Sequence, residues 1–421
     1  MLVYHALFVT LLAGTTGFFT ALAALNVRHA ERTVDEEGDF VTDRLGIDDP
    51  EELLAYNRLG TALGHLQTWM MLVVVLLVLY SGLYADAVAA LEATGWPPFV
   101  RGTVFVVGTV LALQALSLPF DVVETFVVED LFDFNQQTLR LYIRDQLVSL
   151  LVMVVLVGVL ATAVFLAMDA LGELWWVAAW ALFVGFSLLM QVLYPRVIAP
   201  LFNDFDPIES GDLHDAVTDV FDRAGFDTDA IYEMDASRRS SHANAYFIGF
   251  GRTKRVVLFD TLIEQLSIPS VQAVLAHELA HYDRGHIWKQ LGASALWMGA
   301  LLFGASLLVE ATWLYEMFGI AGQPVYAGLV LAVLWLVPVA QLSAPLTNRL
   351  SLAHEREADA FAVEVMGAEP MADALADLTS ENLSNPFPHP LYETFHYDHP
   401  PVPKRLQHIR TLADESAKAE A

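Results

Sequence analysis

Residues 146–168 read QLVSLLVMVVLVGVLATAVFLAM and contain no Asp, Glu, Lys or Arg. The hydrocarbon core of a bilayer is about 30 Å thick, and about 20 apolar residues in an α-helix cross it. A buried helix of a soluble protein is the alternative explanation for any single segment of this kind. The length of the segment and its lack of charge favour a membrane-spanning helix.

Six more charge-free windows flank this segment, and the seven windows are 17 to 24 residues long. They lie at residues 2–25, 66–85, 102–118, 146–168, 174–194, 291–309 and 325–346. Seven such windows in one chain argue against seven buried helices of a soluble protein. We predict a mainly α-helical membrane protein with seven transmembrane helices.

The composition of the whole chain agrees with a membrane protein and excludes one class of partner. The 421 residues are 55% hydrophobic and only 17% charged, whereas about 25% is usual for globular domains. A net charge of -28 argues against nucleic acid as a partner, because phosphate binding requires clustered Lys and Arg. Lys is rare and Asp outnumbers Glu, a bias that suggests a prokaryotic protein adapted to high salt.

The absence of cysteine restricts the chemistry that the chain can perform. With no cysteine in the sequence, the chain has no disulfide, no thiolate metal site and no cysteine-held Fe-S cluster. Any metal ion must therefore be held by histidine and carboxylate side chains.

The distribution of basic residues predicts the orientation of the chain. Arg101 is the single Lys or Arg in the even-numbered loops between the predicted spans, and all others lie in the odd-numbered loops or the tail. Cytoplasmic loops carry the excess of Lys and Arg, so we expect the N-terminus outside and the C-terminus in the cytoplasm. The Ala21-Leu22-Ala23 segment resembles a signal-peptidase site, but Arg28 and Arg32 follow the first span and no basic residue precedes it, which indicates an uncleaved helix.

This topology divides the chain into four parts. The first, residues 1–194, has five transmembrane helices, and the second, residues 195–290, is a cytoplasmic segment. The third, residues 291–346, has transmembrane helices six and seven, and the fourth, residues 347–421, is a cytoplasmic tail. The second part is expected to contain two helices and a small β-hairpin with its turn at Gly249 to Arg252: helices 213–224 and 270–283, strands 244–250 and 254–260.

The segment His277-Glu278-Leu279-Ala280-His281 has the H-E-x-x-H pattern and lies within the predicted helix 270–283. On a helix, two histidines four residues apart share one face and can both bind Zn²⁺, while the Glu beside the first histidine can activate water. The alternative is two histidines on the polar side of a cytoplasmic helix. The pattern predicts a catalytic zinc site.

Catalytic zinc requires a third protein ligand, which in a chain without cysteine is His, Glu or Asp. Glu355 is the best candidate, because it follows the seventh span and shares a helical face with Asp359. A carboxylate at Asp359 can accept the free ring N-H of a ligand histidine. Spacing alone leaves three other residues open as the third ligand: Glu357, His286 and His354.

In these segments the sequence resembles the type I CAAX prenyl proteases, which are integral-membrane zinc metalloendopeptidases. The resemblance begins with H-E-L-A-H at 277–281 and E-x-x-A-D at 355–359. It extends over about residues 115–410, with further matches at 118–120, 125–129, 132–135, 244–251, 254–262, 395–401 and 405–406. One departure is Leu352, where family members often have an arginine after a serine, and Arg349 is the nearest basic alternative.

The resemblance implies a fold, a cofactor and a set of site residues. The expected fold is a barrel of seven transmembrane helices around an internal chamber, with a gluzincin-like zinc site near its cytoplasmic end and one Zn²⁺ per chain. The implied roles are zinc ligation by His277, His281 and Glu355, general acid-base catalysis by Glu278, support of a ligand by Asp359, backbone binding of an extended substrate by Asn244, Ala245 and Tyr246, and oxyanion or substrate stabilisation by His396 and Arg405.

Three functions remain to be compared. The first is a zinc endopeptidase that cuts peptides or membrane-anchored proteins, including C-terminally prenylated ones, at the bilayer. The second is a quality-control protease of the HtpX type, but such chains are shorter and have about four spans. The third is a transporter or channel with a structural metal. Transporters place ionisable residues within their spans, and here the only one is His5, near an end.

Overall fold

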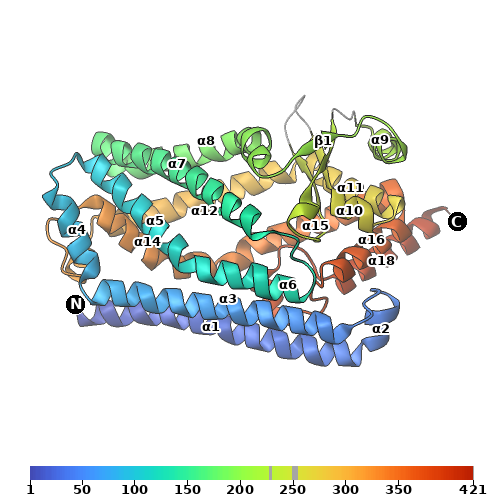
Figure 1. The fold of residues 1–421 in the computed structure, drawn as a ribbon, viewed down its shortest axis with the longest axis horizontal. Helices are drawn as coiled ribbons and strands as arrows, with labels where there is room; N and C mark the ends of the chain where they lie inside the picture. The colour runs from blue at the N-terminus through green and yellow to red at the C-terminus, as the bar shows by residue number, and fades with distance from the viewer. Residues whose placement is uncertain (227–229, 249–254, 421) are drawn as a thin grey trace.

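Seven long helices contain most of each of the seven charge-free windows. In the computed structural model, which describes residues 1–226, 230–248 and 255–420, the chain is mainly helical (Figure 1). The long helices are α1 (Leu2–Glu36), α3 (Pro50–Tyr80), α5 (Pro98–Val123), α7 (Leu139–Leu171), α8 (Trp175–Leu193), α12 (His286–Val309) and α14 (Val325–Leu342). Each predicted span lies largely within one of them, and most of the helices extend beyond the apolar window.

The longest helical stretch supplies two spans. In the described chain, six stretches are long and apolar enough to cross a membrane, and one of them, Leu139–Leu201, has 63 residues. A straight helix of that length would extend about 95 Å at 1.5 Å per residue, three times the thickness of the hydrocarbon core. The chain instead turns at Gly172, whose φ is +53°, and α8 packs back against α7. The number of spans is therefore seven, as predicted.

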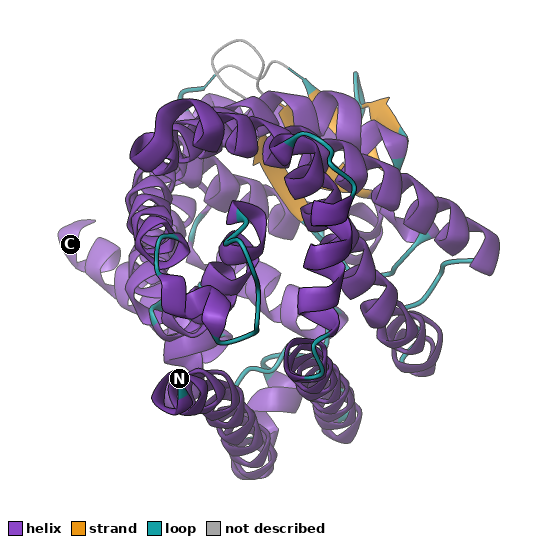
Figure 2. Ribbon diagram, turned by 90° about the vertical axis from the view of Figure 1, so that its left-hand side faces the viewer, coloured by secondary structure: helices purple, strands orange, loops and turns teal. Residues whose placement is uncertain are grey.

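The seven helices form a closed ring. Each contacts the next in the order α1, α3, α5, α7, α8, α12 and α14, and α14 contacts α1. Figure 2 shows the arrangement from one end of the molecule. The contacts confirm the predicted barrel.

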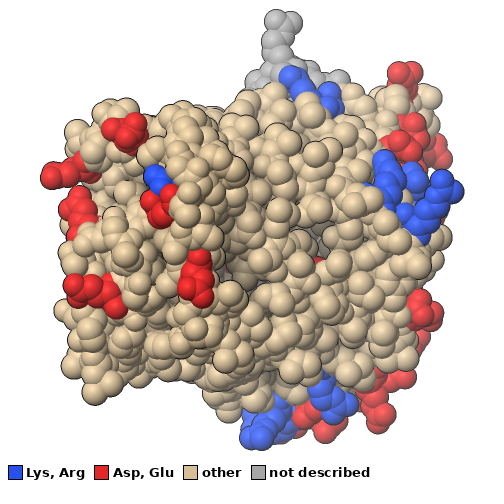
Figure 3. Space-filling model, turned by 60° about the vertical axis from the view of Figure 1, so that its left-hand side comes forward, with Lys and Arg blue, Asp and Glu red and all other residues tan. Residues whose placement is uncertain are grey.

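The outer surface of the ring suits a lipid environment. Four apolar side chains at four-residue spacing on α7 are each more than half exposed: Leu147, Leu151, Val155 and Val159. Figure 3 shows a wide area without charged side chains, with charged groups near its edges. Since a continuous exposed apolar surface of this size is unfavourable in water, these side chains are expected to contact lipid.

The part of the chain outside the ring contains a four-stranded sheet and most of the shorter helices. The sheet has strands in the order β1 (Phe205–Pro207), β2 (Ile231–Met234), β4 (Arg255–Phe259) and β3 (Ala245–Ile248). β3 and β4 are antiparallel, as predicted, whereas β2 pairs with β4 in parallel. The small hairpin of the prediction is therefore half of a four-stranded sheet with β3 at its edge, and the predicted turn at 249–252 lies outside the described residues.

Helices surround this sheet and connect it to the ring. The helices beyond the sheet are α9 (Asp212–Ala224), α10 (Asp260–Gln265), α11 (Ile268–Asp283), α15 (Ala344–Met366), α16 (Ala368–Glu381), α17 (Pro390–His396) and α18 (Val402–Glu420). The remaining helices of the membrane region and its loops are α2 (Gly38–Asp43), α4 (Leu83–Ala93), α6 (Glu129–Leu131), α13 (Thr312–Glu316), and the π or 3-10 segments Glu124–Val128, Gly172–Leu174, Tyr194–Ile198 and Ala199–Leu201. The 3-10 segment Ala236–Arg238 lies between β2 and β3. Helices α9 and α11 confirm the two helices predicted in this part.

Small residues bring α11 and α15 close together beneath the sheet. The two helices pack against each other. Fully buried alanines lie on both of them, at Ala273, Ala276 and Ala280 on α11 and at Ala358 and Ala362 on α15. Because an alanine side chain is short, it allows two helix backbones to approach closely, and a larger side chain would overpack this core. The close approach allows side chains of α15 to reach those of α11.

Candidate metal centre

Helix α11 presents two histidines toward α15. Its first turn is fixed by Ser267, whose side chain accepts a hydrogen bond from the Ser270 N-H, and by Pro269 within that turn, an arrangement that favours helix initiation. His277 and His281 lie one turn apart on this helix, and their Nε2 atoms are 3.3 Å apart. The four-residue spacing therefore brings the two rings together, as the sequence predicted.

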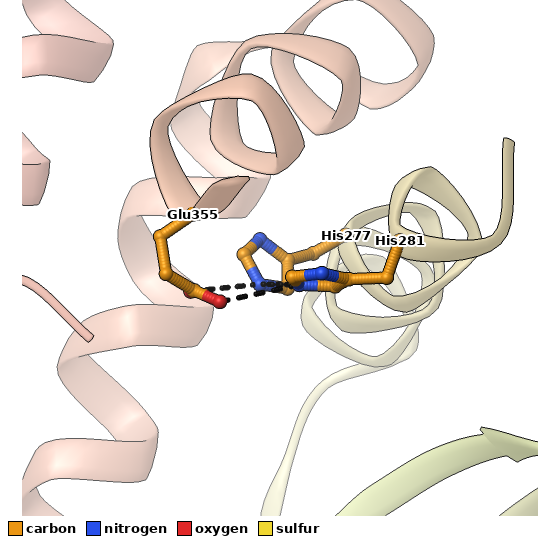
Figure 4. Close-up of side chains that lie close together, drawn as sticks. All are labelled: His277, His281 and Glu355. Atoms are coloured by element: carbon orange, nitrogen blue, oxygen red, sulfur yellow. Dashed lines mark hydrogen bonds and ion pairs between the residues drawn. The ribbon is translucent and has the colours of Figure 1, made fainter. Parts of the chain in front are cut away.

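Glu355 on α15 completes the group. Its Oε2 lies 3.3 Å from Nε2 of His277, and its Oε1 lies 3.3 Å from Nε2 of His281 (Figure 4). One donor atom from each of these residues lies within 4.8 Å of the others, and within residues 1–226, 230–248 and 255–420 this is the one such cluster of three or more His, Asp or Glu residues.

The donor set and its surroundings fit a zinc ion. Glu355 is only 3% exposed, and its Oε2 makes no hydrogen bond of good geometry, although Nε2 of His277 lies 3.3 Å away. An unsatisfied carboxylate oxygen is costly in a buried position, whereas a cation held between it and two imidazole nitrogens satisfies it. Two histidines and one carboxylate are also typical ligands of catalytic zinc. The arrangement is a zinc site formed by His277, His281 and Glu355.

Asp359 and Arg405 support His277 from behind. Nδ1 of His277 lies 3.1 Å from Oδ1 of Asp359, so the ring N-H can donate to that carboxylate while Nε2 faces Glu355. Arg405 on α18 donates from Nε to Asp359 Oδ2 at 3.0 Å and from Nη2 to Oδ1 at 2.5 Å. The pair is buried, with Asp359 0% and Arg405 8% exposed. A bidentate Arg-carboxylate pair of this kind fixes the orientation of the carboxylate.

The carboxylates around His277 favour a positive charge at the site. Burial opposes protonation of His277, but its contacts with Asp359 and Glu355 outweigh burial and raise the pKa of His277 to about 9 in the protein without metal. Burial acts to raise the pKa of Glu355, and the two histidines reverse this effect and lower it. A metal ion replaces the proton, because a ligand imidazole must be neutral. The electrostatics that favour a proton here therefore also favour a zinc ion.

The other three candidates for the third ligand lie elsewhere. Nδ1 of His286 lies 3.1 Å from Nδ1 of His281, which is the side of the ring that faces away from Glu355. His354 stacks on His286, and Glu357 pairs with His286. These residues form a group behind His281 and do not join the three ligands.

The structure brings His399 to the metal ligands in place of His396. Nε2 of His399 lies 3.4 Å from Oε1 of Glu355. His396, at the end of α17, stacks on Tyr392 and contacts the edge of Phe19 on α1, and it lines a separate cavity. His396, to which the resemblance assigned oxyanion or substrate stabilisation, lies away from the metal ligands, because α17 ends at His396 and the chain after it turns back toward α15. The H-x-x-H spacing of this segment was the available signal.

Two cavities meet at the metal site. One has a volume of about 310 Å³ and includes Asn244, Ala245 and Arg405 in its wall, and the other, of about 520 Å³, includes Phe247. The wall of the second cavity also includes residues of membrane helices α8 and α12: Phe183, Ser187, Gln191, Gln290, Leu291 and Ser294. Glu278 and His399 line both cavities. Edge strand β3 therefore runs from one cavity to the other past the metal ligands.

Comparisons with known proteins agree with this site. Residues 41–204 match the family model described as CAAX prenyl protease N-terminal, five membrane helices, and residues 207–413 match peptidase family M48. A CAAX prenyl protease 1 homolog of Oryza sativa subsp. japonica is 36% identical over 317 residues, which cover 75% of this chain and 74% of that protein. CAAX prenyl protease 1 of Saccharomyces cerevisiae is 32% identical over 73% of this chain and 72% of its own length.

A solved structure shows the same fold. The crystal structure of S. mikatae Ste24p superposes with a TM-score of 0.87 and 25% sequence identity, and the match covers 96% of this chain and 98% of that chain. These relatives are eukaryotic, so the prokaryotic, salt-adapted origin inferred from composition is not supported by them. The chain belongs to the CAAX prenyl protease 1 family of M48 peptidases and is a multi-pass zinc metalloprotease of the membrane.

Proposed function

We propose that this protease cuts peptide bonds near the C-terminus of prenylated, CAAX-type membrane proteins. The observation that carries the proposal is the position of the metal ligands, between a cavity bounded by membrane helices α8 and α12 and a second cavity bounded by the soluble part of the chain. This position suits a substrate held to the bilayer by a lipid. The names of the relatives, which are CAAX prenyl proteases, support the same substrate class. The five-helix N-terminal region supports it over a quality-control protease of the HtpX type.

Glu278 is the proposed general base and acid. When bound, zinc supplies a Lewis acid that makes water nucleophilic near neutral pH. Glu278 follows His277 on α11 and lines both cavities, so its carboxylate is placed to take a proton from the attacking water and to give it to the leaving amine nitrogen. Asp359 holds the N-H of His277, and Arg405 holds Asp359. We therefore assign Arg405 an orienting role through Asp359.

The edge of β3 is the proposed site for the substrate backbone. Its neighbour in the sheet is β4, and within the described residues the other edge of β3 pairs with no strand. An extended peptide can add to such an edge through backbone hydrogen bonds that do not depend on side-chain identity. Asn244 and Ala245 would bind the peptide beside one cavity, and Tyr246 lies between them and Phe247 at the other. This arrangement supports broad tolerance of substrate sequence.

His399 is the proposed donor to the oxygen of the scissile carbonyl. Its ring lies at the junction of the two cavities, and Nδ1 is held by Asp398 at 2.9 Å, which directs the opposite nitrogen toward Glu355. Loss of one oxyanion donor typically lowers turnover by about 10²- to 10³-fold. His399→Ala is therefore expected to reduce kcat by at least about tenfold, or 1.4 kcal/mol, and to retain zinc.

His396→Ala is the matched control for His399→Ala. It removes the same ring three residues earlier, where the side chain packs on Tyr392, and kcat should stay near that of the unmodified enzyme. Both variants should be compared by kcat, zinc content and thermal midpoint. A normal kcat for His399→Ala, or a loss of activity that is larger for His396→Ala, would contradict the assignment.

The proposed orientation has the N-terminus outside and the metal site in the cytoplasm. Figure 3 supports it, because the charged side chains at the left of the view are mainly Asp and Glu, whereas most of the Lys and Arg lie at the right and lower edges, beside further Asp and Glu. The same orientation supports the four-part division of the chain at residues 194, 290 and 346.

Cysteine labelling tests this orientation in a chain that has no cysteine of its own. Ala321, in the exposed loop between α13 and α14, is a better position than the neighbouring Gly322, whose φ of +75° disfavours a side chain. Ala321→Cys should react with an impermeant maleimide added to intact cells, and Ser210→Cys, in the soluble part, should react only after lysis. The reverse pattern would contradict the orientation.

The substrate class is tested with purified protein and two peptides of one sequence. One peptide ends in a farnesylated CAAX tetrapeptide and the other has the same residues without the lipid. We expect cleavage of the farnesylated peptide with a higher kcat/KM, and no cleavage of either peptide by Glu278→Gln. Equal kcat/KM for the two peptides would show that the lipid is not recognised.

A further inference from the structure

The second ligand histidine, His281, is supported by different residues from those that support the first, His277. Nε2 of His281 faces Glu355, and its Nδ1 lies 3.1 Å from Nδ1 of His286. We propose that His286 is a positioning residue that fixes the tautomer and the orientation of His281, and that Glu357 and His354 in turn hold His286. The proposal concerns retention of the metal and does not depend on the substrate.

The hydrogen bonds continue from the ring of His286 to a carboxylate. Nε2 of His286 lies 3.0 Å from Oε2 of Glu357, and Nζ of Lys289 lies 3.8 Å from the same oxygen. His286 is only 3% exposed, so both of its ring nitrogens require partners. Nδ1 of His286 has His281 as its partner, and Nε2 of His286 has Glu357. The group is therefore a continuous line of hydrogen bonds from a metal ligand to the surface.

The backbone and a stacked ring fix the position of His286. Helix α11 ends at Asp283, Gly285 adopts a φ of +64°, and α12 begins at His286. This tight turn returns the first residue of α12 to the last turn of α11. His354 then covers the ring of His286 in a nearly parallel stack, with centroids 4.1 Å apart and an angle of 11° between the planes. The ring can neither swing out nor rotate without losing this contact.

The protons can be placed in one consistent way. A metal on Nε2 of His281 requires the lone pair of that atom, so the proton of the neutral ring is on Nδ1. That N-H donates to Nδ1 of His286, which must then carry its own proton on Nε2 and donate it to Glu357. The opposite tautomer of His286 would direct two N-H groups at each other and leave the carboxylate of Glu357 without this donor. The negative charge of Glu357 therefore selects the tautomer of His281 that binds metal.

The two ligand histidines thus have equivalent support from α15. Asp359 contacts His277 directly, whereas Glu357 reaches His281 through one additional ring. Helix α15 supplies the third ligand Glu355 and, within two residues of it, both groups that hold His286. Loss of such a supporting partner typically costs about 10- to 100-fold in metal affinity, and we expect an effect of this size for His286.

The experiment measures zinc release from purified full-length protein into excess chelator. His286→Ala should release zinc about 10- to 100-fold faster than the unmodified protein, and its cobalt-substituted form should have an altered visible absorption spectrum. In His286→Asn the side-chain oxygen can accept from His281 Nδ1, so this variant should recover most of the lost retention. Glu357→Ala, a change at a half-exposed side chain, should act in the same direction and add little to His286→Ala.

His354→Phe is the control for packing. It retains an aromatic ring against His286 and removes only nitrogen atoms that the proposal does not use, so zinc release should be unchanged. Unchanged release from both His286→Ala and Glu357→Ala would overturn the proposal. It would also be overturned if His286→Asn lost zinc as fast as His286→Ala, because the effect would then be one of ring packing. Each outcome is independent of which peptide the enzyme cuts.

Discussion

Glu278→Gln is expected to retain one zinc per chain and to lower peptide hydrolysis by about 10²- to 10⁴-fold, the usual contribution of a general acid-base residue. Glutamine has nearly the same shape as glutamate but cannot take a proton from water. Glu278 is not one of the three side chains that converge on the metal, so its loss should leave the ligand set intact. The result should appear in kcat, with zinc content measured on the same sample.

Glu264→Gln is a suitable control for this variant. Glu264 lies on α10, is exposed, and lines neither of the two cavities at the metal site. Its replacement makes the same change in net charge within the soluble part of the chain. Normal hydrolysis by Glu278→Gln would mean that another group acts as the base. Loss of zinc from this variant would mean that Glu278 contributes to metal binding.

Glu355→Gln is expected to lose both zinc and activity. The Glu355 oxygens lie 3.3 Å from the Nε2 atoms of His277 and His281, and the buried carboxylate is the only negatively charged member of the three ligands. An amide is neutral and is a weaker ligand for zinc, so the loss of affinity should exceed the about 10- to 100-fold typical of outer partners. Zinc content after dialysis against a chelator measures this loss.

Two comparisons make this result interpretable. Glu364→Gln, at an exposed position on the same helix α15, should retain zinc and activity. The Glu278→Gln variant provides a folded, inactive reference for the thermal midpoint, which separates loss of metal from loss of fold. If Glu355→Gln retained full zinc occupancy, the third ligand would have to be another residue, and Glu357 and His286 would be the next to test.

The sequence alone was enough to identify the transmembrane helices and the two histidine ligands, and it made Glu355 the best candidate for the third ligand. Both depend on local properties. A charge-free window of about 20 residues satisfies the requirement of a bilayer wherever it occurs in the chain, and the four-residue spacing of His277 and His281 places two rings on one helical face. Glu355 was the best candidate because it lies four residues before Asp359 on the same helical face, although Glu357, His286 and His354 remained open on spacing alone.

Only the tertiary structure decided which distant side chains meet. The closure of seven helices into a ring, the addition of β1 and β2 to the predicted hairpin, and the contact of Arg405 with Asp359 all join segments far apart in the chain. The choice of His399 over His396 depends on where α17 ends, and the place of His286 depends on the turn at Gly285. Helical periodicity defines the face on which a residue lies, but the approach of α15 to α11 depends on the packing of buried alanines from both helices, and no single segment contains that information.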